Sequence, residues 1–128
     1  MKRNRKIDIA IVDDHFLYRK GLKIAFSFYD NINIIFDADN GLHLLDQLKA
    51  AEPELILLDL QMQVMDGITV LPQIKTKYPR IKVIILSINS EEAMVEKLRL
   101  LGADSYLSKS DDPRKMYREI LDVMEVSA

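Results

Sequence analysis

The 128-residue sequence contains no cysteine and no tryptophan, and it has only four glycines and four prolines. The absence of cysteine excludes disulfides, thiolate metal sites and a cysteine nucleophile, and it agrees with a reducing compartment. No stretch of about 18 uncharged apolar residues is present, so no membrane-spanning helix is expected. These absences together predict a soluble, cytoplasmic protein that has no contact with a membrane.

The sequence also lacks a strong charge of either sign, since 18 lysines and arginines face 20 aspartates and glutamates, a formal net charge of -2. Proteins that bind nucleic acid backbones normally carry a basic field, so this chain is not expected to bind nucleic acid directly. Basic residues do cluster near the start, but Asp8 interrupts the apolar stretch that a secretory signal requires. Residues 1–6 are interpreted as a basic N-terminal tail, and residues 7–126 as one domain.

Short apolar runs alternate along the chain with longer segments of helical period, which predicts parallel strands joined by crossover helices. The strands are expected at residues 7–12, 32–36, 55–58, 82–86 and 104–107. Residues 55–58 and 83–86 are apolar at every position, so these two strands should lie in the middle of the sheet with helices over both faces.

Five helices are expected between and after these strands, where apolar residues recur every three or four positions. Their apolar positions span residues 17–28, 44–48, 71–78, 94–101 and 116–124. Asp66 and Gly67 mark the start of the third helix, and Asp112 followed by Pro113 marks the start of the fifth. The pattern predicts an α/β fold, a flavodoxin-like (βα)5 doubly wound parallel sheet with strand order 2-1-3-4-5.

Acidic residues stand at the ends of two of these strands. Asp13 and Asp14 follow the first strand and Asp59 follows the third, and in this strand order the ligand crevice opens between those two ends. Two unit charges about 4 Å apart repel by about 4 kcal/mol at an effective dielectric near 20, so either one acid is protonated or a cation is bound. An all-oxygen cluster favours Mg²⁺ as that cation.

Two further polar residues follow the fourth and fifth strands, Ser87 and Lys109, and both can donate to phosphate oxygens. Each has a simpler explanation when taken alone: Asp14 is a suitable helix cap, Ser87 a turn residue and Lys109 a loop cation. His15 is interpreted as a surface residue outside the site. The coincidence of the other groups at one edge of the predicted sheet favours a phosphoryl-binding site.

Four segments carry a resemblance to a known family: residues 11–15 (IVDDH), 57–62 (LLDLQM, with Asp66 and Gly67), 85–87 (ILS) and 102–109 (GADSYLSK). As a set they resemble the receiver domain of two-component response regulators, over residues 7 to about 126. Residues 13–22 are most similar to the NarL/LuxR subgroup, whose members join a receiver to a DNA-binding domain. Control of transcription would therefore require an effector domain absent from this chain, and a stand-alone receiver is the alternative.

The resemblance implies that Asp59 accepts a phosphoryl group from a sensor histidine kinase or phosphotransfer protein. It also implies that Mg²⁺ is the cofactor, held directly by Asp14 and Asp59, through water by Asp13, and by the backbone carbonyl of Gln61. Such a domain is a signalling phosphoacceptor rather than an enzyme, although it can promote its own phosphorylation and dephosphorylation.

The same resemblance assigns Lys109 and Ser87 to the phosphoryl oxygens and makes Ser87 and Tyr106 the switch residues. Ser87 would move toward the phosphate, and Tyr106 would turn into the space that this movement frees. The face formed by the fourth helix, fifth strand and fifth helix would then change shape as a two-state element. A phosphorylation-dependent homodimer is one outcome that this change permits.

Three positions depart from the common family pattern. Gln63 and Ser110 stand where many receivers have proline, which leaves open the loop after the third strand and the isomer of the Lys109–Ser110 peptide bond. Ile88 follows Ser87 where a small residue is frequent. Its branched side chain is expected to slow the access of water and of small phosphodonors.

Three other functions are weighed against this interpretation. An Mg²⁺-dependent phosphohydrolase of the haloacid dehalogenase type places its nucleophile after the first strand with a second acid two residues later, whereas Asp13 and Asp14 are adjacent here. A phosphorylation-independent interaction module does not require the intact set of acids, hydroxyl and lysine. A flavodoxin requires a hydroxyl-rich phosphate cradle after the first strand, where this chain is acidic.

Overall fold

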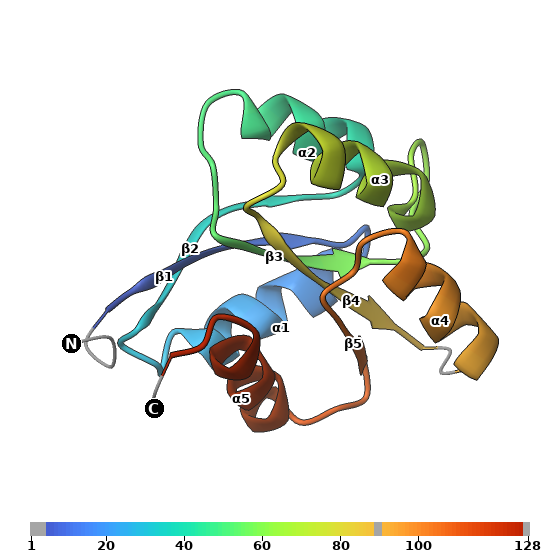
Figure 1. Ribbon diagram of the computed structural model, residues 1–128. Coiled ribbons are helices and arrows are strands. Elements are labelled where there is room, and N and C mark those ends of the chain that lie inside the picture. The colour runs from blue at the N-terminus through green and yellow to red at the C-terminus, as the bar shows by residue number, and fades with distance from the viewer. Residues whose placement is uncertain (1–4, 89–90, 127–128) are drawn as a thin grey trace.

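The computed structural model describes residues 5–88 and 91–126, in which five strands alternate with five helices (Figure 1). The strands are β1 (Ile7–Val12), β2 (Ile32–Ala38), β3 (Leu55–Asp59), β4 (Lys82–Ser87) and β5 (Ser105–Ser108). The helices are α1 (Phe16–Phe26), α2 (Gly41–Leu48), α3 (Gly67–Lys77), α4 (Glu92–Leu100) and α5 (Pro113–Val123). The interpretation of residues 1–6 as a tail falls largely outside the described residues; within it, Arg5 pairs with Glu54.

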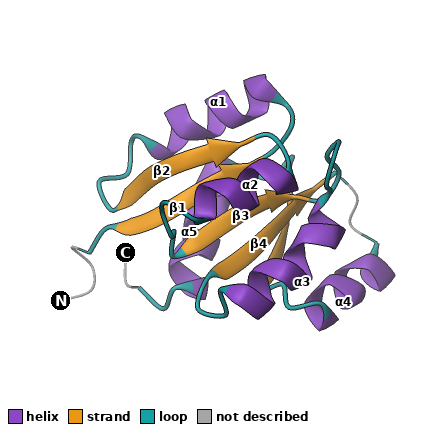
Figure 2. Ribbon diagram, turned by 90° about the horizontal axis from the view of Figure 1, so that it is seen from above, coloured by secondary structure: helices purple, strands orange, loops and turns teal. Residues whose placement is uncertain are grey.

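The sheet is parallel throughout, with strand order β2-β1-β3-β4-β5, as the sequence predicts (Figure 2). Helices α1 and α5 cover one face, and α2 and α3 cover the other (Figure 1). All five residues of β3 are buried, because this strand lies between β1 and β4 with helices above and below. The chain leaves β1 toward β2 on one side and returns to β3 on the other, which creates the predicted reversal point.

Two apolar clusters form the core, one on each side of the sheet. Leu55 and Leu57 of β3 belong to the cluster beneath α1 and α5, whereas Ile56 and Leu58 belong to the cluster beneath α2 and α3. Successive side chains of a strand point to opposite faces, so one continuous apolar run supplies both clusters. Leu98 places α4 with the second cluster.

The apolar positions that predicted the first helix do not form its buried face. Leu17, Ile24 and Phe28 recur at helical spacing within residues 17–28, but all three are exposed, and Leu22 and Phe26 are buried instead. Apolar residues occupy more than one side of this segment, so their period alone does not select the side that packs on the sheet. The helix also ends at Phe26, before the last residue of the predicted pattern.

Strand ends differ from the prediction in a way that matters for the site. Strands β3 and β4 each extend one residue further than predicted, and Asp59 pairs with Leu86 while Ser87 pairs with Ser108. The candidate acid and the candidate hydroxyl therefore belong to strands of the sheet, whose hydrogen bonds fix their backbones.

No described peptide bond is cis, so the bond after Lys109 is trans. None of the described helices has the length and apolar character needed to cross a membrane.

Candidate functional site

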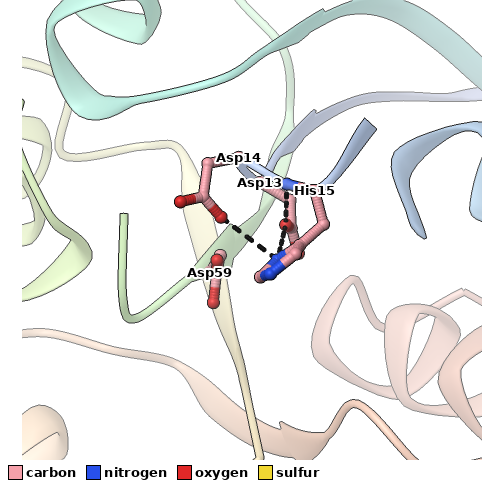
Figure 3. Close-up of side chains that lie close together, drawn as sticks. All are labelled: Asp13, Asp14, His15 and Asp59. Carbon is pink, nitrogen blue, oxygen red and sulfur yellow. Dashed lines mark hydrogen bonds and ion pairs between the residues drawn. The ribbon is translucent and has the colours of Figure 1, made fainter. Parts of the chain in front are cut away.

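Three acidic side chains meet at the carboxyl ends of β1 and β3. Asp13 and Asp59 are 1% and 3% exposed, and Asp14 is partly exposed beside them. One ligand atom from each of these acids and from His15 can be chosen so that all four lie within 4.8 Å of one another (Figure 3). The structure thus brings the three predicted acids into one cluster at the reversal point of the sheet.

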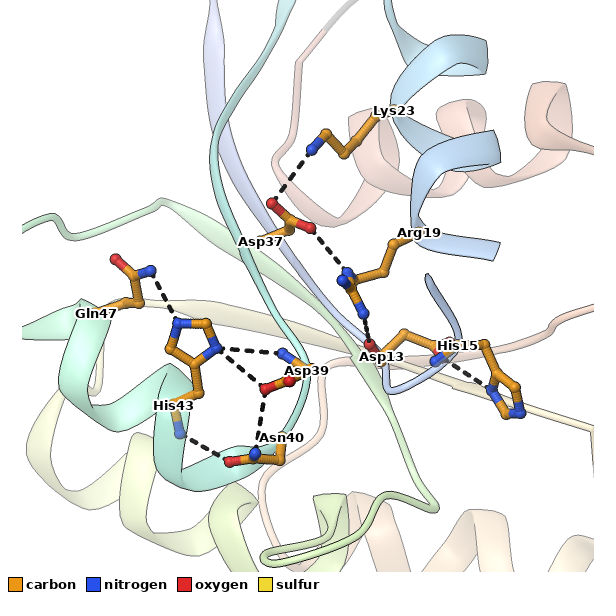
Figure 4. Close-up of polar contacts among 9 residues, drawn as sticks. All are labelled: Asp13, His15, Arg19, Lys23, Asp37, Asp39, Asn40, His43 and Gln47. Carbon is orange, nitrogen blue, oxygen red and sulfur yellow. Dashed lines mark hydrogen bonds and ion pairs between the residues drawn. The ribbon is translucent and has the colours of Figure 1, made fainter. Parts of the chain in front are cut away.

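The backbone of Asp13 is held from both neighbouring elements. Its N–H donates to the carbonyl of Ala38 at 3.0 Å, and the Arg19 guanidinium donates to the Asp13 carbonyl at 2.6 Å. Arg19 Nε also donates to Asp37 at 2.8 Å, and Lys23 Nζ reaches the other Asp37 oxygen at 3.2 Å (Figure 4). Helix α1 is thereby tied to the ends of β1 and β2. Arg19 is part of the motif at residues 13–22, but sequence reasoning assigned it no role.

Asp37 makes the stability of this region depend on pH. Burial alone would raise its pKa, but the hydrogen bonds from Arg19 and Lys23 outweigh burial and hold the pKa of this carboxyl below its usual range. A carboxylate with a lowered pKa in the folded state stabilises the fold above its ordinary pKa, and this stabilisation is lost as the pH falls through the lowered pKa.

Asp37→Asn is expected to lower the free energy of unfolding by about 1–2 kcal/mol at neutral pH, because two charge-assisted hydrogen bonds weaken. The difference between parent and variant should shrink as the pH falls below the ordinary pKa of aspartate toward the lowered pKa of Asp37. Urea unfolding near pH 7 and near pH 3 measures both values. A difference of equal size at the two pH values would contradict the assignment.

Gly67 permits the close approach of α3 to the end of β3. Its N–H donates to the Leu60 carbonyl at 2.9 Å, and a Cβ at this position would lie 2.5 Å from the Asp59 carbonyl oxygen. Asp66 caps the helix by accepting from the Thr69 N–H at 2.9 Å, which confirms the predicted helix start. The backbone of the candidate phosphoacceptor therefore rests directly against a glycine.

Gly67→Ala is expected to destabilise the protein by about 1–3 kcal/mol, the usual cost of overpacking, because backbone atoms cannot yield as a flexible side chain can. The backbone movement that makes room for the added methyl group should also displace Asp59 and slow its phosphorylation. Thermal unfolding and phosphorylation by acetyl phosphate test the two effects. Gly21→Ala is the matched control, since a Cβ at Gly21 meets no atom within 4 Å, and loss of stability in both variants would contradict the explanation.

Lys109 lies across the acid cluster. Its ammonium is 2.6 Å from Asp13 Oδ2 and 3.2 Å from Asp59 Oδ1, and its side chain is only 11% exposed. Tyr18 of α1 supports it: the Tyr18 ring lies 4.9 Å from the ammonium, and the Tyr18 hydroxyl donates to the Lys109 carbonyl at 3.4 Å. Burial, with Asp13 and Asp59 nearby, raises the pKa of Tyr18, so its hydroxyl keeps its proton. Sequence reasoning missed Tyr18.

The cluster carries more negative charge than Lys109 can balance. Burial first, and Asp13 second, raise the pKa of Asp59 to about 6, although Lys109 acts in the opposite direction. Asp59 Oδ2 is buried without a hydrogen-bond partner. An unpaired carboxylate oxygen among other carboxylates is the ligand type that Mg²⁺ and other hard cations use. The residues present therefore fit a divalent cation.

The other predicted site residues border this cluster. The Gln61 N–H lies 3.4 Å from Asp59 Oδ1, which places this residue at the edge of the site. Ser87 is buried at the end of β4, and its carbonyl accepts from the Lys109 N–H at 3.0 Å. Tyr106 of β5 packs against the core cluster beneath α2 and α3, and its hydroxyl is buried without a hydrogen-bond partner.

His15 was predicted to be a surface residue outside the site, and the structure places it at the surface but beside the acids. Its Nδ1 lies 3.1 Å from an oxygen of Asp13 and 3.1 Å from an oxygen of Asp14, although the side chain is 70% exposed (Figure 3). The residue has extended backbone angles at the start of α1, and its N–H donates to Asp13 at 2.8 Å. This local turn directs the ring to the acids, which no sequence signal indicated.

Known proteins share both the sequence pattern and this fold. The response regulator receiver domain family matches residues 9–121. The transcriptional regulatory protein DegU of Brevibacillus brevis is 32% identical over 107 residues, covering 84% of this chain and 45% of DegU. The nitrate/nitrite response regulator NarL of Escherichia coli K12 is 29% identical over 120 residues, covering 94% and 56%. The receiver domain structure of NarL from Mycobacterium tuberculosis superposes with a TM-score of 0.88 at 30% identity, covering 94% and 98%.

The chain therefore belongs to the receiver domain family of two-component response regulators. Within that family its relatives are regulators of the NarL/LuxR type, as the motif at residues 13–22 predicted. The chain spans about half the length of the curated relatives it matches, 45% to 56% of each.

Proposed function

We propose that this domain accepts a phosphoryl group on Asp59 from a sensor histidine kinase or phosphotransfer protein. The observation that carries the proposal is the position of Asp59, whose buried carboxylate has one unpartnered oxygen and lies 3.2 Å from the Lys109 ammonium. A nucleophile, a counter-charge and the neighbouring acids of a cation site thus lie together in one cluster. Relatives that regulate transcription support the assignment.

In the proposed transfer, an Asp59 oxygen attacks the phosphorus, the new O–P bond forms, and the bond between phosphorus and the donor histidine nitrogen breaks. Asp13, Asp14 and Asp59, with the carbonyl of Gln61, would hold Mg²⁺, which when bound neutralises charge on the phosphoryl oxygens. Lys109, whose ammonium lies beside Asp13 and Asp59, would contribute a second positive charge. Phosphoryl transfer depends mainly on positioning and charge neutralisation, which these side chains provide.

The proposed switch uses Ser87 and Tyr106, which come from neighbouring strands. The phosphoryl group adds about 1.5 to 2 negative charges and three strong acceptor oxygens, and the Ser87 hydroxyl would donate to one of them. Tyr106 has a buried hydroxyl without a partner, so a rearrangement that gives this hydroxyl a partner is favourable. We propose that the surface of α4, β5 and α5 changes with these two residues and relays the signal.

The output we propose is control of transcription through an effector domain outside this chain. The relatives are transcriptional regulators about twice its length. Phosphorylation-dependent dimerisation is part of this proposal, and size-exclusion chromatography with light scattering, before and after phosphorylation, measures it. A receiver that acts without an attached effector, or without phosphorylation, is the alternative.

Acetyl phosphate and Mg²⁺ provide the direct test. Intact mass spectrometry should show one added phosphate on the parent and none on Asp59→Asn. Asp46→Asn is the matched control, because Asp46 is an exposed acid on α2 away from the cluster, and it should be phosphorylated like the parent. Phosphate on the Asp59 variant, or none on the parent, would overturn the proposal.

Ile88→Ala is expected to raise the rates of phosphorylation by acetyl phosphate and of aspartyl phosphate hydrolysis. Ile88 is 80% exposed directly after Ser87, so its bulk acts on access from solvent and does not fill the space between the acids. We therefore expect an increase of a few-fold, which corresponds to less than about 1.4 kcal/mol of barrier. Time courses of intact mass measure both rates, and unchanged rates would count against obstruction by this side chain.

A further inference from the structure

His15 brings a nitrogen donor into a cluster that otherwise offers only oxygens. Its Nδ1 is equidistant from Asp13 and Asp14, at 3.1 Å from one oxygen of each. Figure 3 shows the ring beside these two carboxylates, with Asp59 completing the group. The other histidine, His43 of α2, lies outside this cluster, and its Nδ1 lies 3.2 Å from Asp39, which precedes the helix.

Hydrogen bonding accounts for only one of these two contacts, because Nδ1 is hydrogen-bonded to Asp13 Oδ1 at 3.1 Å, whereas Asp14 Oδ1 is buried without a hydrogen-bond partner. An imidazole Nδ1 carries at most one proton, so it cannot donate fully to two carboxylates at once. One of the two acceptors, Asp13 Oδ1, already accepts from the backbone N–H of His15 at 2.8 Å. One nitrogen and two oxygens that converge in this way are better satisfied by a shared cation.

The separations fit one coordination sphere. Around a divalent ion bound at about 2.1 Å, adjacent octahedral ligands lie about 3.0 Å apart and opposite ligands about 4.2 Å apart. The two 3.1 Å separations correspond to adjacent positions, and the four ligand atoms all lie within 4.8 Å of one another, so the set is compact enough to surround one ion after a small adjustment of the side chains. Asp59 supplies an independent indication, because its Oδ2 is buried without a hydrogen-bond partner.

We propose that His15 is an additional protein ligand and that the cluster binds a first-row divalent transition metal, such as Mn²⁺, Co²⁺ or Zn²⁺, more tightly than Mg²⁺. Imidazole is a good ligand for these borderline metals, whereas Mg²⁺ prefers oxygen ligands and retains water. Three carboxylates and one imidazole therefore favour a transition metal over Mg²⁺ by chemistry as well as by geometry. The inference rests on the proposed function, because it uses the same acidic cluster.

Coordination of the metal by His15 would also link the metal to α1. His15 precedes the first residue of this helix, and Arg19 one turn later binds the Asp13 carbonyl. A metal bound through the imidazole would therefore join the start of α1 to the acidic loop at a second point. Mg²⁺ bound only through the acids would leave that ring free to move.

The test is a titration of the parent, His15→Ala and His43→Ala with Co²⁺ and, separately, with Mg²⁺, followed by calorimetry. His43 is the matched control, since its Nδ1 also lies 3.2 Å from an aspartate oxygen, but outside the cluster. Loss of an outer-shell partner typically weakens metal binding by about 10–100-fold, so loss of a ligand should weaken Co²⁺ binding by at least about tenfold. The affinity for Mg²⁺ should differ by less than about twofold among the three proteins, because Mg²⁺ is held by oxygen ligands.

A spectroscopic readout separates coordination from a merely structural effect. Proton NMR of the Co²⁺ complexes should show paramagnetically shifted imidazole signals in the parent and in His43→Ala, and none in His15→Ala. Equal Co²⁺ affinities in the parent and His15→Ala, or the absence of shifted imidazole signals in the parent, would overturn this inference and leave Mg²⁺ binding and phosphorylation intact. A parent that binds neither metal and takes up no phosphate would overturn the proposed function itself.

Discussion

Replacing Asp59 by asparagine is expected to stabilise the metal-free protein by about 2–3 kcal/mol near pH 8, since one pKa unit corresponds to about 1.4 kcal/mol. Burial and the adjacent Asp13 raise the pKa of Asp59 from 3.8 to about 6. A group with a raised pKa in the folded state stabilises the fold at pH values below its unfolded pKa, and this contribution is lost as the pH rises through about 6. Asparagine removes the charge and therefore its cost at alkaline pH.

Urea unfolding in the presence of a chelator, near pH 8 and near pH 4, tests this prediction. The advantage of Asp59→Asn should be large at the higher pH and close to zero at the lower one, and Asp46→Asn should show neither effect. Adding Mg²⁺ should stabilise the parent by mass action and reduce the difference. A variant that is no more stable than the parent at alkaline pH would show that the cluster is already neutralised without a metal.

The order and placement of the strands were predictable because burial imposes a clear pattern on them. Residues 55–58 and 83–86 are apolar throughout, which is required only of strands covered on both faces. Once these two strands are central, Asp59 and Ser87 must fall at neighbouring ends of one edge. The acid cluster followed from the same reasoning, because parallel strands bring their carboxyl ends to the same side of the sheet.

The features that sequence reasoning missed depend on how α1 is rotated against the sheet. Leu22 and Phe26 pack on the core, and Tyr18, one turn earlier on the same side, contacts Lys109. Arg19 is the next residue, so the same rotation carries it to Asp37 and to the Asp13 carbonyl. The helical period of the apolar residues does not determine this rotation. The contacts of Tyr18 and Arg19 with the site could therefore not be predicted from the sequence.

The position of His15 shows a different limit of sequence analysis. Exposure is the usual state of a histidine at a helix start, and this side chain is indeed exposed, yet its nitrogen reaches two acids. A residue at the rim of a crevice can be solvated on one side and contact a ligand site on the other. Sequence gives the average exposure of such a position but not the direction of the ring.

Lys109→Met is expected to destabilise the protein by about 3–5 kcal/mol near pH 8, because removing one partner of a buried ion pair leaves its counter-charges uncompensated. The ammonium lies within 3.2 Å of oxygens of both Asp13 and Asp59, the two most buried acids of the cluster. The loss should be smaller near pH 5, where Asp59 can take up a proton. The rate of phosphorylation should fall by about 10²–10³-fold, the usual effect of losing one donor to a developing negative charge.

Lys109→Arg separates the two roles of this side chain. A guanidinium keeps the positive charge but is planar and larger than an ammonium, so it should restore much of the stability and little of the rate. Lys49→Met is the control for the loss of an exposed lysine, and it should leave both quantities unchanged. Urea unfolding and time courses of intact mass with acetyl phosphate measure the two effects. If Lys109→Met were phosphorylated at the parental rate, the phosphoryl oxygens would be neutralised without this lysine, and its role would be confined to holding the acids together in the folded chain.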